Sequence, residues 1–284
     1  MYYIPFLGAI ALATGTIIQK TVLRKKKINI KLYQNAGFLA ITLVMIPLIF
    51  LFWQVNSQAL ELKNILIFVL VIVFSIIANL FVDYSMKWEK VSNLEPAKIL
   101  EPLFIIFLAI IFSFLISEEL YEANLNVIIP ALLSGAALIL SHIKKHHLKF
   151  NKYFLAAIAG SFFFALELII SRLILNFYSP ISFYFIRCAS VFVLTLIIFK
   201  PDYKKINTKL RWKIFGLGII WVIYRIAIYY GYLHLGVIFT TLMLMLGPLF
   251  IYLFAWKFLK EKLDWRNIIA AIVIVGSILY AILV

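Results

Sequence analysis

The sequence is poor in charged residues and has a single cysteine. Charged residues make up 14% of the 284 positions, whereas hydrophobic residues make up 65%. This composition excludes intrinsic disorder and is too apolar for an ordinary soluble domain. Cys188 lies within an apolar run. The chain therefore cannot form an internal disulfide, and we expect the thiol to pack as a small hydrophobic group.

Motifs typical of common enzymes and pumps are also missing. No glycine-rich phosphate loop ending in lysine is present, which argues against ATP-driven pumping. Neither a zinc-protease helix motif nor a serine elbow occurs. His142, His146 and His147 cluster beside lysines, and these positive surroundings favour a solvated loop over a metal site. We therefore expect no enzymatic activity, no metal and no cofactor.

Long apolar runs are abundant. About 20 apolar residues suffice for a helix to cross a bilayer, and ten such runs are present. The expected spans are Tyr3–Leu23, Gln34–Trp53, Asn64–Met86, Val91–Ile116, Asn124–Ser141, Tyr153–Asn176, Ser179–Phe199, Arg211–Tyr232, Val237–Phe258 and Asn267–Val284. The connections are short, so the sequence predicts an all-α polytopic membrane protein without a soluble domain. The first run lacks the charged leader and cleavage pattern of a removable signal peptide, and we expect it to remain as a span.

The net charge of +15 is distributed unevenly among the loops. Loops after odd-numbered spans carry most of the lysines and arginines, whereas the even-numbered loops hold only Lys63. Lysine and arginine collect on the cytoplasmic side of membrane proteins. The pattern therefore predicts cytoplasmic odd loops and both termini outside. Contact with anionic lipid is a secondary role for these residues, and we expect no nucleic-acid partner.

The two halves of the sequence resemble each other. EPLFI at 101–105 in the fourth span matches GPLFI at 247–251 in the ninth. Further pairs keep the same order: Lys20 with Arg172, Asn35 with Arg187, Asn126 with Asn267, and Gly135 with Gly276. Residues 1–149 and 150–284 each hold five spans, so the second half enters the membrane from the opposite side. The pattern predicts two inverted five-helix repeats, a plan in which secondary transporters build a site near the bilayer midplane. The alternative is that apolar helices merely reuse similar short sequences.

The stretch 93–104, NLEPAKILEPLF, alternates ionisable residues with prolines: Glu95, Pro96, Lys98, Glu101 and Pro102. Ionisable groups beside a membrane-length run are costly unless they face protein or water. Each proline also disturbs the preceding helical turn. Pro102 and Pro248 interrupt corresponding spans, so we expect them to mark the cavity of a carrier and to act in coupling or as hinges. The alternative is a helix whose charges lie in a cytoplasmic loop and whose prolines merely begin it.

Four ionisable residues from four spans share a layer near mid-depth: Glu101, Glu167, Arg187 and Arg225. Counted at about 1.5 Å per residue, they lie roughly 15–20 Å from the odd-loop side. Pairing two acids with two bases is the least costly arrangement. We expect Glu101 to pair with Arg225 and Glu167 with Arg187, although the partners are interchangeable at this stage.

Two roles are open for this layer. An arginine suits the binding of an anionic group such as a carboxylate, because its planar fork matches that geometry. Burial disfavours a charged carboxyl group, so Glu101 or Glu167 is a candidate carrier of a coupling proton. The alternative is a permanent ion-pair network that fixes helix register. We also expect Tyr184, Trp221, Tyr224 and Asn79 to line the substrate cavity, with ordinary packing as the alternative for each.

The arrangement of these features resembles the EamA-type carriers of the drug/metabolite transporter superfamily. Residues 248–283, PLFIYLFAWKFLKEKLDWRNIIAAIVIVGSILYAIL, are the most similar part. SPISFYFIRC, 179–188, resembles the family's entry to the second helix of a half, with Arg187 at its arginine position. Asn35, the first-half counterpart, departs from that pattern. The resemblance implies termini in the cytoplasm, which conflicts with the charge pattern.

The resemblance implies secondary transport of a small organic solute, such as a metabolite or amino acid, by alternating access. It also implies a monomer or homodimer in a prokaryotic plasma membrane. A nucleotide-sugar or phosphate exchanger is the first alternative. A membrane-embedded enzyme or lipid-handling protein, and a structural subunit whose charges only pair, are the others. A central cavity closed at one end would favour the carrier.

Overall fold

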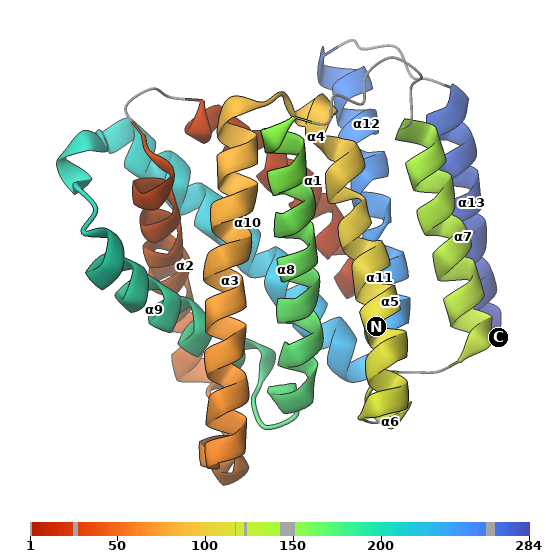
Figure 1. Cartoon of the computed structure of the whole chain (residues 1–284), viewed down its shortest axis with the longest axis horizontal. Coiled ribbons are helices and arrows are strands. Elements are labelled where there is room, and N and C mark those ends of the chain that lie inside the picture. The colour runs from red at the N-terminus through yellow and green to blue at the C-terminus, as the bar shows by residue number, and fades with distance from the viewer. Residues whose placement is uncertain (1, 25–27, 117, 122–123, 143–150, 260–264) are drawn as a thin grey trace.

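A computed structural model of the chain describes all residues except 1, 25–27, 117, 122–123, 143–150 and 260–264 (Figure 1). The structure is 89% helical, and its described residues form no strand. The helices are α1 (Tyr3–Leu23), α2 (Ile30–Phe52), η1 (Ser57–Leu60), α3 (Leu62–Trp88), α4 (Val91–Lys98), α5 (Leu100–Leu115), α6 (Glu118–Tyr121), α7 (Leu125–His142), α8 (Lys152–Leu175), α9 (Pro180–Phe199), η2 (Tyr203–Lys205), α10 (Thr208–His234), α11 (Val237–Leu244), α12 (Leu246–Leu259) and α13 (Trp265–Leu283).

Short polar side chains cap the N-termini of several of the long helices. The side chains of Asn29, Asn151 and Asn207 accept hydrogen bonds from backbone N–H groups in the first turns of α2, α8 and α10. Ser179 caps α9 in the same way, and Pro180 follows at a position where its missing N–H costs nothing. These caps satisfy backbone donors that have no partner inside the helix. They explain why each helix begins where a polar connection meets an apolar run.

Within the described part of the chain, eight helical segments are long and apolar enough to cross a membrane, which supports an integral membrane protein. They are Tyr3–Leu23, Ile30–Phe52, Leu62–Trp88, Leu94–Leu115, Lys152–Leu175, Pro180–Phe199, Thr208–His234 and Trp265–Leu283. Two of the ten expected spans correspond to shorter apolar segments, Leu125–Ser141 and Val237–Ile251. Large apolar side chains such as Phe50 (84% exposed) and Phe114 (83% exposed) lie on the outer surface. Apolar exposure on this scale suits contact with lipid rather than water.

The fourth and ninth expected spans are each broken into two helices. α4 ends at Lys98 and α5 begins at Leu100, while α11 ends at Leu244 and α12 begins at Leu246. In each case a proline lies four residues after the end of the first helix, at Pro102 and Pro248. A proline has no N–H for the carbonyl four residues before it and its ring crowds that carbonyl. The two prolines therefore account for both breaks.

The most extensive helix contacts join the two halves of the chain: α1 with α10, α3 with α8, α2 with α9, and α7 with α13. Glycines allow two of these approaches. A Cβ atom added at Gly8 of α1 would lie 2.9 Å from the Ala227 Cβ of α10. One added at Gly160 of α8 would lie 2.6 Å from the Val82 Cγ2 of α3. The tilted α2–α9 pair and the α7–α13 pair form opposite edges of the helix bundle (Figure 1).

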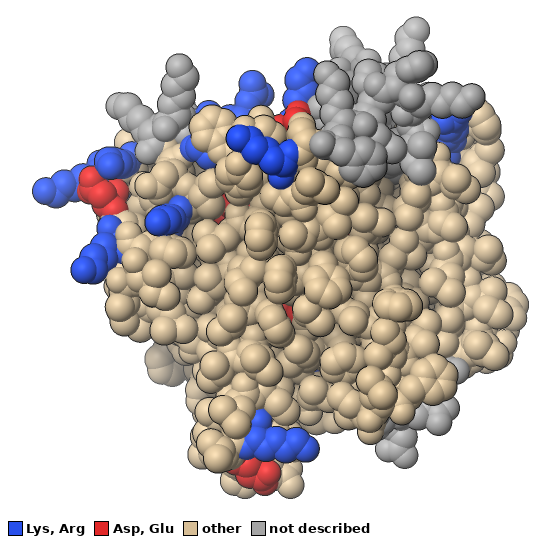
Figure 2. Space-filling view, in the orientation of Figure 1, with Lys and Arg blue, Asp and Glu red and all other residues tan. Residues whose placement is uncertain are grey.

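The basic residues lie on one side of the molecule. The connections from α3 to α4 and from α9 to α10 lie toward the upper edge in Figure 1, and both termini are marked well below it. On the face in Figure 2, most Lys and Arg side chains gather along that edge above a broad, largely uncharged band, while one small charged group lies at the bottom. This distribution agrees with the predicted basic odd loops and favours a cytoplasmic location for that side.

Candidate functional site

A cavity of about 170 Å³ lies between helices from both halves of the chain. Eleven of the residues expected to form the site line it: Asn79, Glu95, Lys98, Glu101, Pro102, Tyr184, Arg187, Trp221, Tyr224, Arg225 and Pro248. Glu167 and Pro96 do not. Residues at both proline breaks contribute to the wall, including Ile99 beside the first and Leu244 beside the second. The interrupted helices therefore border the cavity, as the prolines predicted.

The cavity occupies the part of the bundle nearer the basic loops. On α3 it is lined by Asn79, Val82 and Asp83, all in the second half of the helix before the third loop. On α2 its lining runs from Tyr33 to Ile41, in the first half of that helix. The arginines lie at the other end, nearer the even-loop side. The cavity therefore extends from the two arginines toward the basic side.

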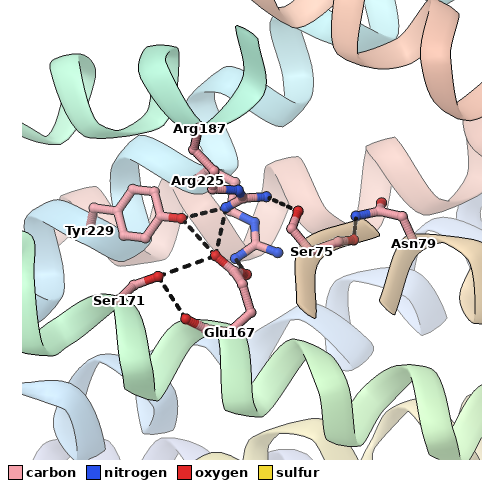
Figure 3. Close-up of polar contacts among 7 residues, drawn as sticks. All are labelled: Ser75, Asn79, Glu167, Ser171, Arg187, Arg225 and Tyr229. Carbon is pink, nitrogen blue, oxygen red and sulfur yellow. Dashed lines mark hydrogen bonds and ion pairs between the residues drawn. The ribbon is translucent and has the colours of Figure 1, made fainter. Parts of the chain in front are cut away.

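A single carboxylate holds both arginines (Figure 3). Glu167 of α8 is fully buried, and its Oε1 accepts a hydrogen bond from Arg187 Nη1 at 2.8 Å. Its Oε2 accepts one from Arg225 Nη1 at 2.9 Å. The predicted Glu167–Arg187 pair is thus present. Glu167 lies behind the cavity wall and acts as the counter-ion of the two arginines rather than as a lining residue.

Neutral groups complete the surroundings of Glu167 and Arg187. Tyr229 donates from its hydroxyl to Glu167 Oε1 at 3.1 Å and accepts a hydrogen bond from Arg187. Arg187 Nη2 donates to Ser75 Oγ of α3 at 3.1 Å. Ser171, one turn after Glu167, donates to the Glu167 backbone carbonyl at 2.6 Å. Four helices therefore fix this pair, and charge-assisted bonds of this kind are the strong ones in a buried setting.

Arg225 is held less completely than Arg187. Its only described hydrogen bond is the one to Glu167, and it lies in the cavity wall with 6% of its surface exposed. Its guanidinium group lies 5.2 Å from the Phe164 ring centroid and 5.9 Å from that of Tyr224. Trp221 packs edge-on against Tyr224 with a centroid separation of 5.6 Å. The predicted aromatic residues thus form a wall around the arginine fork.

Glu101 does not pair with Arg225, contrary to the first of the two expected pairs. Glu101 is partly exposed in the cavity wall and makes no hydrogen bond or ion pair within the described residues. It nevertheless lies close enough to Arg225 and Lys98 for electrostatic interaction. The reason is geometric: both oxygens of Glu167 already occupy the space between the guanidinium groups. Two arginines share one carboxylate, and the second carboxylate faces the cavity.

The end of the cavity nearer the basic loops has its own polar groups. Asp83 Oδ1 accepts a hydrogen bond from Gln19 Nε2 at 2.8 Å, and Asp83 is 1% exposed. Glu95 lines the same end and is 6% exposed. Asp83 was absent from the predicted site because it lies near a helix end. The sequence nevertheless indicates that Asp83 faces the cavity, because Ser75, Asn79 and Asp83 are four residues apart and such residues share one helix face.

The opposite end of the bundle is filled by aromatic rings. Phe68, Tyr178, Phe183 and Tyr229 form a connected cluster with centroid separations of 5.0–5.9 Å. Phe183 and Tyr229 are fully buried. Tyr229 also reaches the ion pair, so the aromatic cluster begins where the cavity ends. These packed rings lie on the even-loop side of the ion pair.

Asn35, the counterpart of Arg187 in the first half, has a different role. Its side chain donates to Thr195 Oγ1 at 2.8 Å and to the Phe192 carbonyl at 2.9 Å, both on α9. Tyr203 of η2 donates to its carbonyl oxygen, and burial raises the pKa of that tyrosine. Asn35 thus ties α2 to α9 and to the loop that follows. The two halves do not build two equivalent arginine sites.

Among the described residues, no group of His, Cys, Asp and Glu is arranged to hold a metal ion. His146 and His147 lie outside the described residues, and nothing is described of the His142 side chain. Cys188 is fully buried, as expected of a packed thiol.

Comparisons with known proteins agree with this geometry. Residues 151–283 match the EamA-like transporter family, which confirms the resemblance noted in the sequence. A solved crystal structure with 16% sequence identity superposes with a TM-score of 0.73, covering 99% of this chain and 96% of the other. At that identity the match establishes the fold alone. No curated protein matches the chain.

Proposed function

Because the second half of the chain matches the EamA-like transporter family, we propose that the protein is a secondary transporter of a small organic solute. The solute binds in the central cavity through an anionic group held by Arg225, and transport proceeds by alternating access. A transporter family also argues against an enzymatic role for the cavity charges.

The main support for this proposal is the charge imbalance between the two arginines and their single counter-ion, Glu167. Two buried guanidinium groups share the single carboxylate of Glu167. Both arginines border the cavity, but Arg187 uses both of its terminal nitrogens on protein groups, whereas Arg225 commits only one nitrogen. One positive charge is thus left for a ligand. A carboxylate matches the planar fork of arginine and restores neutrality at the buried site.

Glu101 suggests that the solute also carries a positive group. Its carboxyl group lines the same cavity, has no described hydrogen-bond partner, and interacts electrostatically with Arg225. A zwitterion with a carboxylate on Arg225 and an ammonium group toward Glu101 satisfies both charges. Trp221 and Tyr224 supply an apolar wall for the rest of the molecule. We therefore favour an amino-acid-like metabolite as the solute.

Alternating access follows from the proposed repeat of residues 1–149 and 150–284. Contacts between α1 and α10 correspond to those between α8 and α3 when the halves are exchanged, and both pairs pack closely. Gly8 and Gly160, which lie in these contacts, are separated by the same number of residues as Asn35 and Arg187. The two proline breaks also correspond. These features support ten spans in two inverted repeats, which rock about a site at their interface.

The arrangement corresponds to an inward-facing carrier. The cavity lies on the side of the basic loops, which the positive-inside rule assigns to the cytoplasm. The aromatic cluster of Phe68, Tyr178, Phe183 and Tyr229 closes the other side. This orientation puts both termini outside. For the termini, it therefore agrees with the location outside that the charge pattern predicts, rather than with the cytoplasmic location that the family resemblance implies.

Other functions fit less well. A phosphate or nucleotide-sugar exchanger would use Lys98 with the arginines, but Asp83, Glu95 and Glu101 line the same cavity and would repel a dianion. A structural subunit would be expected to have a dry interior with every charge paired. The proposed carrier accounts for the cavity and for the unpaired Glu101.

A thermal-shift series on the purified protein tests the proposal. A ligand that binds the folded state raises the unfolding temperature. We expect amino acids to raise it, and their amides, which lack the carboxylate, to raise it much less. The deaminated acids should give an intermediate shift, because they keep the contact with Arg225 but leave Glu101 without its ammonium partner.

The matched control is Arg211→Ala, which removes an exposed arginine from the same helix, α10, outside the cavity. This variant should respond to amino acids as the wild type does. Equal shifts from the amino acids and their amides would contradict carboxylate recognition. A shift from inorganic phosphate alone would favour the exchanger.

A further inference from the structure

We propose that Asp83 is the proton-binding group of this carrier, at a site distinct from the arginine pair. The inference concerns how transport would be coupled, and in that respect it rests on the proposed function. The chemistry is a simple protonation: a proton from water binds a carboxylate oxygen of Asp83 and is later released, and no other bond changes.

The surroundings of Asp83 make its charge costly. The side chain is 1% exposed and its one described hydrogen bond comes from the neutral amide of Gln19, at 2.8 Å. No described cation lies within ion-pair distance of it. Burying a carboxylate with so little compensation disfavours its charged form. Because Asp83 also borders the cavity, a proton can reach it through the space that the solute uses.

Three further buried polar atoms in the same wall lack partners among the described residues: Glu95 Oε1, Gln34 Oε1 and Ser161 Oγ. Their residues are 6%, 2% and 0% exposed, and all three line the cavity. Buried polar groups normally have hydrogen-bond partners. Unpartnered groups that border a cavity are therefore placed to bind water or a ligand inside it. This end of the cavity is built for hydrogen bonding and is suited to conduct protons to Asp83.

The two carboxyl groups near the arginines, Glu167 and Glu101, suit proton binding less well. Glu167 accepts hydrogen bonds from Arg187, Arg225 and Tyr229, so a proton there would displace strong charge-assisted bonds. The sequence indicated Glu101 or Glu167 as the residue that carries a coupling proton. These bonds argue against Glu167 in that role. Glu101 interacts with Arg225 and Lys98 and is partly exposed. Its burial disfavours the charged form, but both cations favour that form and partly offset the effect of burial.

A proton fits the site better than a metal cation. Asp83 interacts with Gln19 from α1, Tyr33 from α2 and Lys98 from α4, while Glu95 from α4 and Ser161 from α8 line the same cavity. Lys98 interacts electrostatically with Asp83, and its described contact is the Met86 sulfur at 3.4 Å. A second full positive charge beside Lys98 would be repelled. A proton instead removes the charge of Asp83 and relieves its burial.

Infrared difference spectroscopy tests the site without any solute. The purified full-length protein in lipid vesicles is titrated with acid while the carbonyl stretch of protonated carboxylic acids is followed. We expect the wild type to show a protonated-carboxyl band that titrates and is lost in Asp83→Asn. Glu61→Gln, which alters an exposed acid at the start of the same helix, should leave the band unchanged.

A second variant keeps the test decisive if Asp83→Asn does not fold. Gln19→Ala removes a donor that stabilises the charged form of Asp83, so the band should titrate about one pH unit higher. Persistence of the band in Asp83→Asn, its loss in Glu101→Gln instead, or an unchanged midpoint in Gln19→Ala would each overturn the assignment. Because no solute is used, failure here leaves the proposed transport function to its own test.

Discussion

Arg225→Ala should abolish transport while leaving a folded protein. The variant loses an arginine that lies in the cavity wall and, among the described residues, hydrogen-bonds through only one of its nitrogens. A hydrogen bond to a charged group is worth about 1.5–3 kcal/mol. Losing a two-bond contact should therefore weaken carboxylate binding by roughly 100-fold or more. Solute uptake into proteoliposomes and the ligand-induced thermal shift measure the two consequences.

The fold should survive because the remaining charges stay balanced. Without Arg225, Glu167 still pairs with Arg187 and accepts the Tyr229 hydroxyl. Arg225→Lys should keep the charge but lose the planar fork, and thus recover only part of the binding. Arg211→Ala is again the matched control, with wild-type uptake expected. Undiminished uptake by Arg225→Ala would reject the assignment of this residue to the solute.

Glu167→Gln should have the largest effect on stability. Glu167 is fully buried and is the described counter-ion of two arginines. Breaking a buried ion pair by removing one partner typically costs about 3–5 kcal/mol, because the remaining charge is left uncompensated. Here two charges are left. We expect a loss of well-folded protein on extraction, measured by size-exclusion chromatography and thermal unfolding.

A double variant separates charge balance from packing. Glu167→Gln combined with Arg225→Gln removes one acid and one base, so it should be more stable than Glu167→Gln alone. Such non-additivity is expected of residues that share one network. Wild-type stability of the single Glu167→Gln variant would show that the arginines do not depend on this carboxylate.

Structural features that depend on residues close together in the sequence were predictable from the sequence alone. Pro102 and Pro248 marked the two helix breaks, because the effect of a proline on the carbonyl four residues earlier is local. The distribution of lysines and arginines gave the side on which the odd loops lie. Ser179 and the asparagines mark helix starts for similarly local reasons. Each of these depends on neighbours in sequence and needs no knowledge of packing.

Features that depend on helix rotation were not predictable in the same way. Counting residues gave the depth of Glu167, Arg187 and Arg225, but depth does not say which face of a helix meets which neighbour. Two arginines consequently converge on Glu167, while Glu101 faces the cavity. Asp83 lies near a helix end and was not among the predicted site residues, yet it is buried and lines the cavity. These outcomes depend on tertiary contacts.

Single-cysteine accessibility tests the central claim most directly. Gly37 lines the cavity, and a Cβ atom added there meets nothing within 4 Å. In a Cys188→Ala background, Gly37→Cys should react with a membrane-impermeant thiol reagent applied on the basic-loop side, and a bound amino acid should slow the reaction. A thiol that cannot be reached from that side, or whose reaction no amino acid affects, would contradict a solute site in an inward-facing cavity.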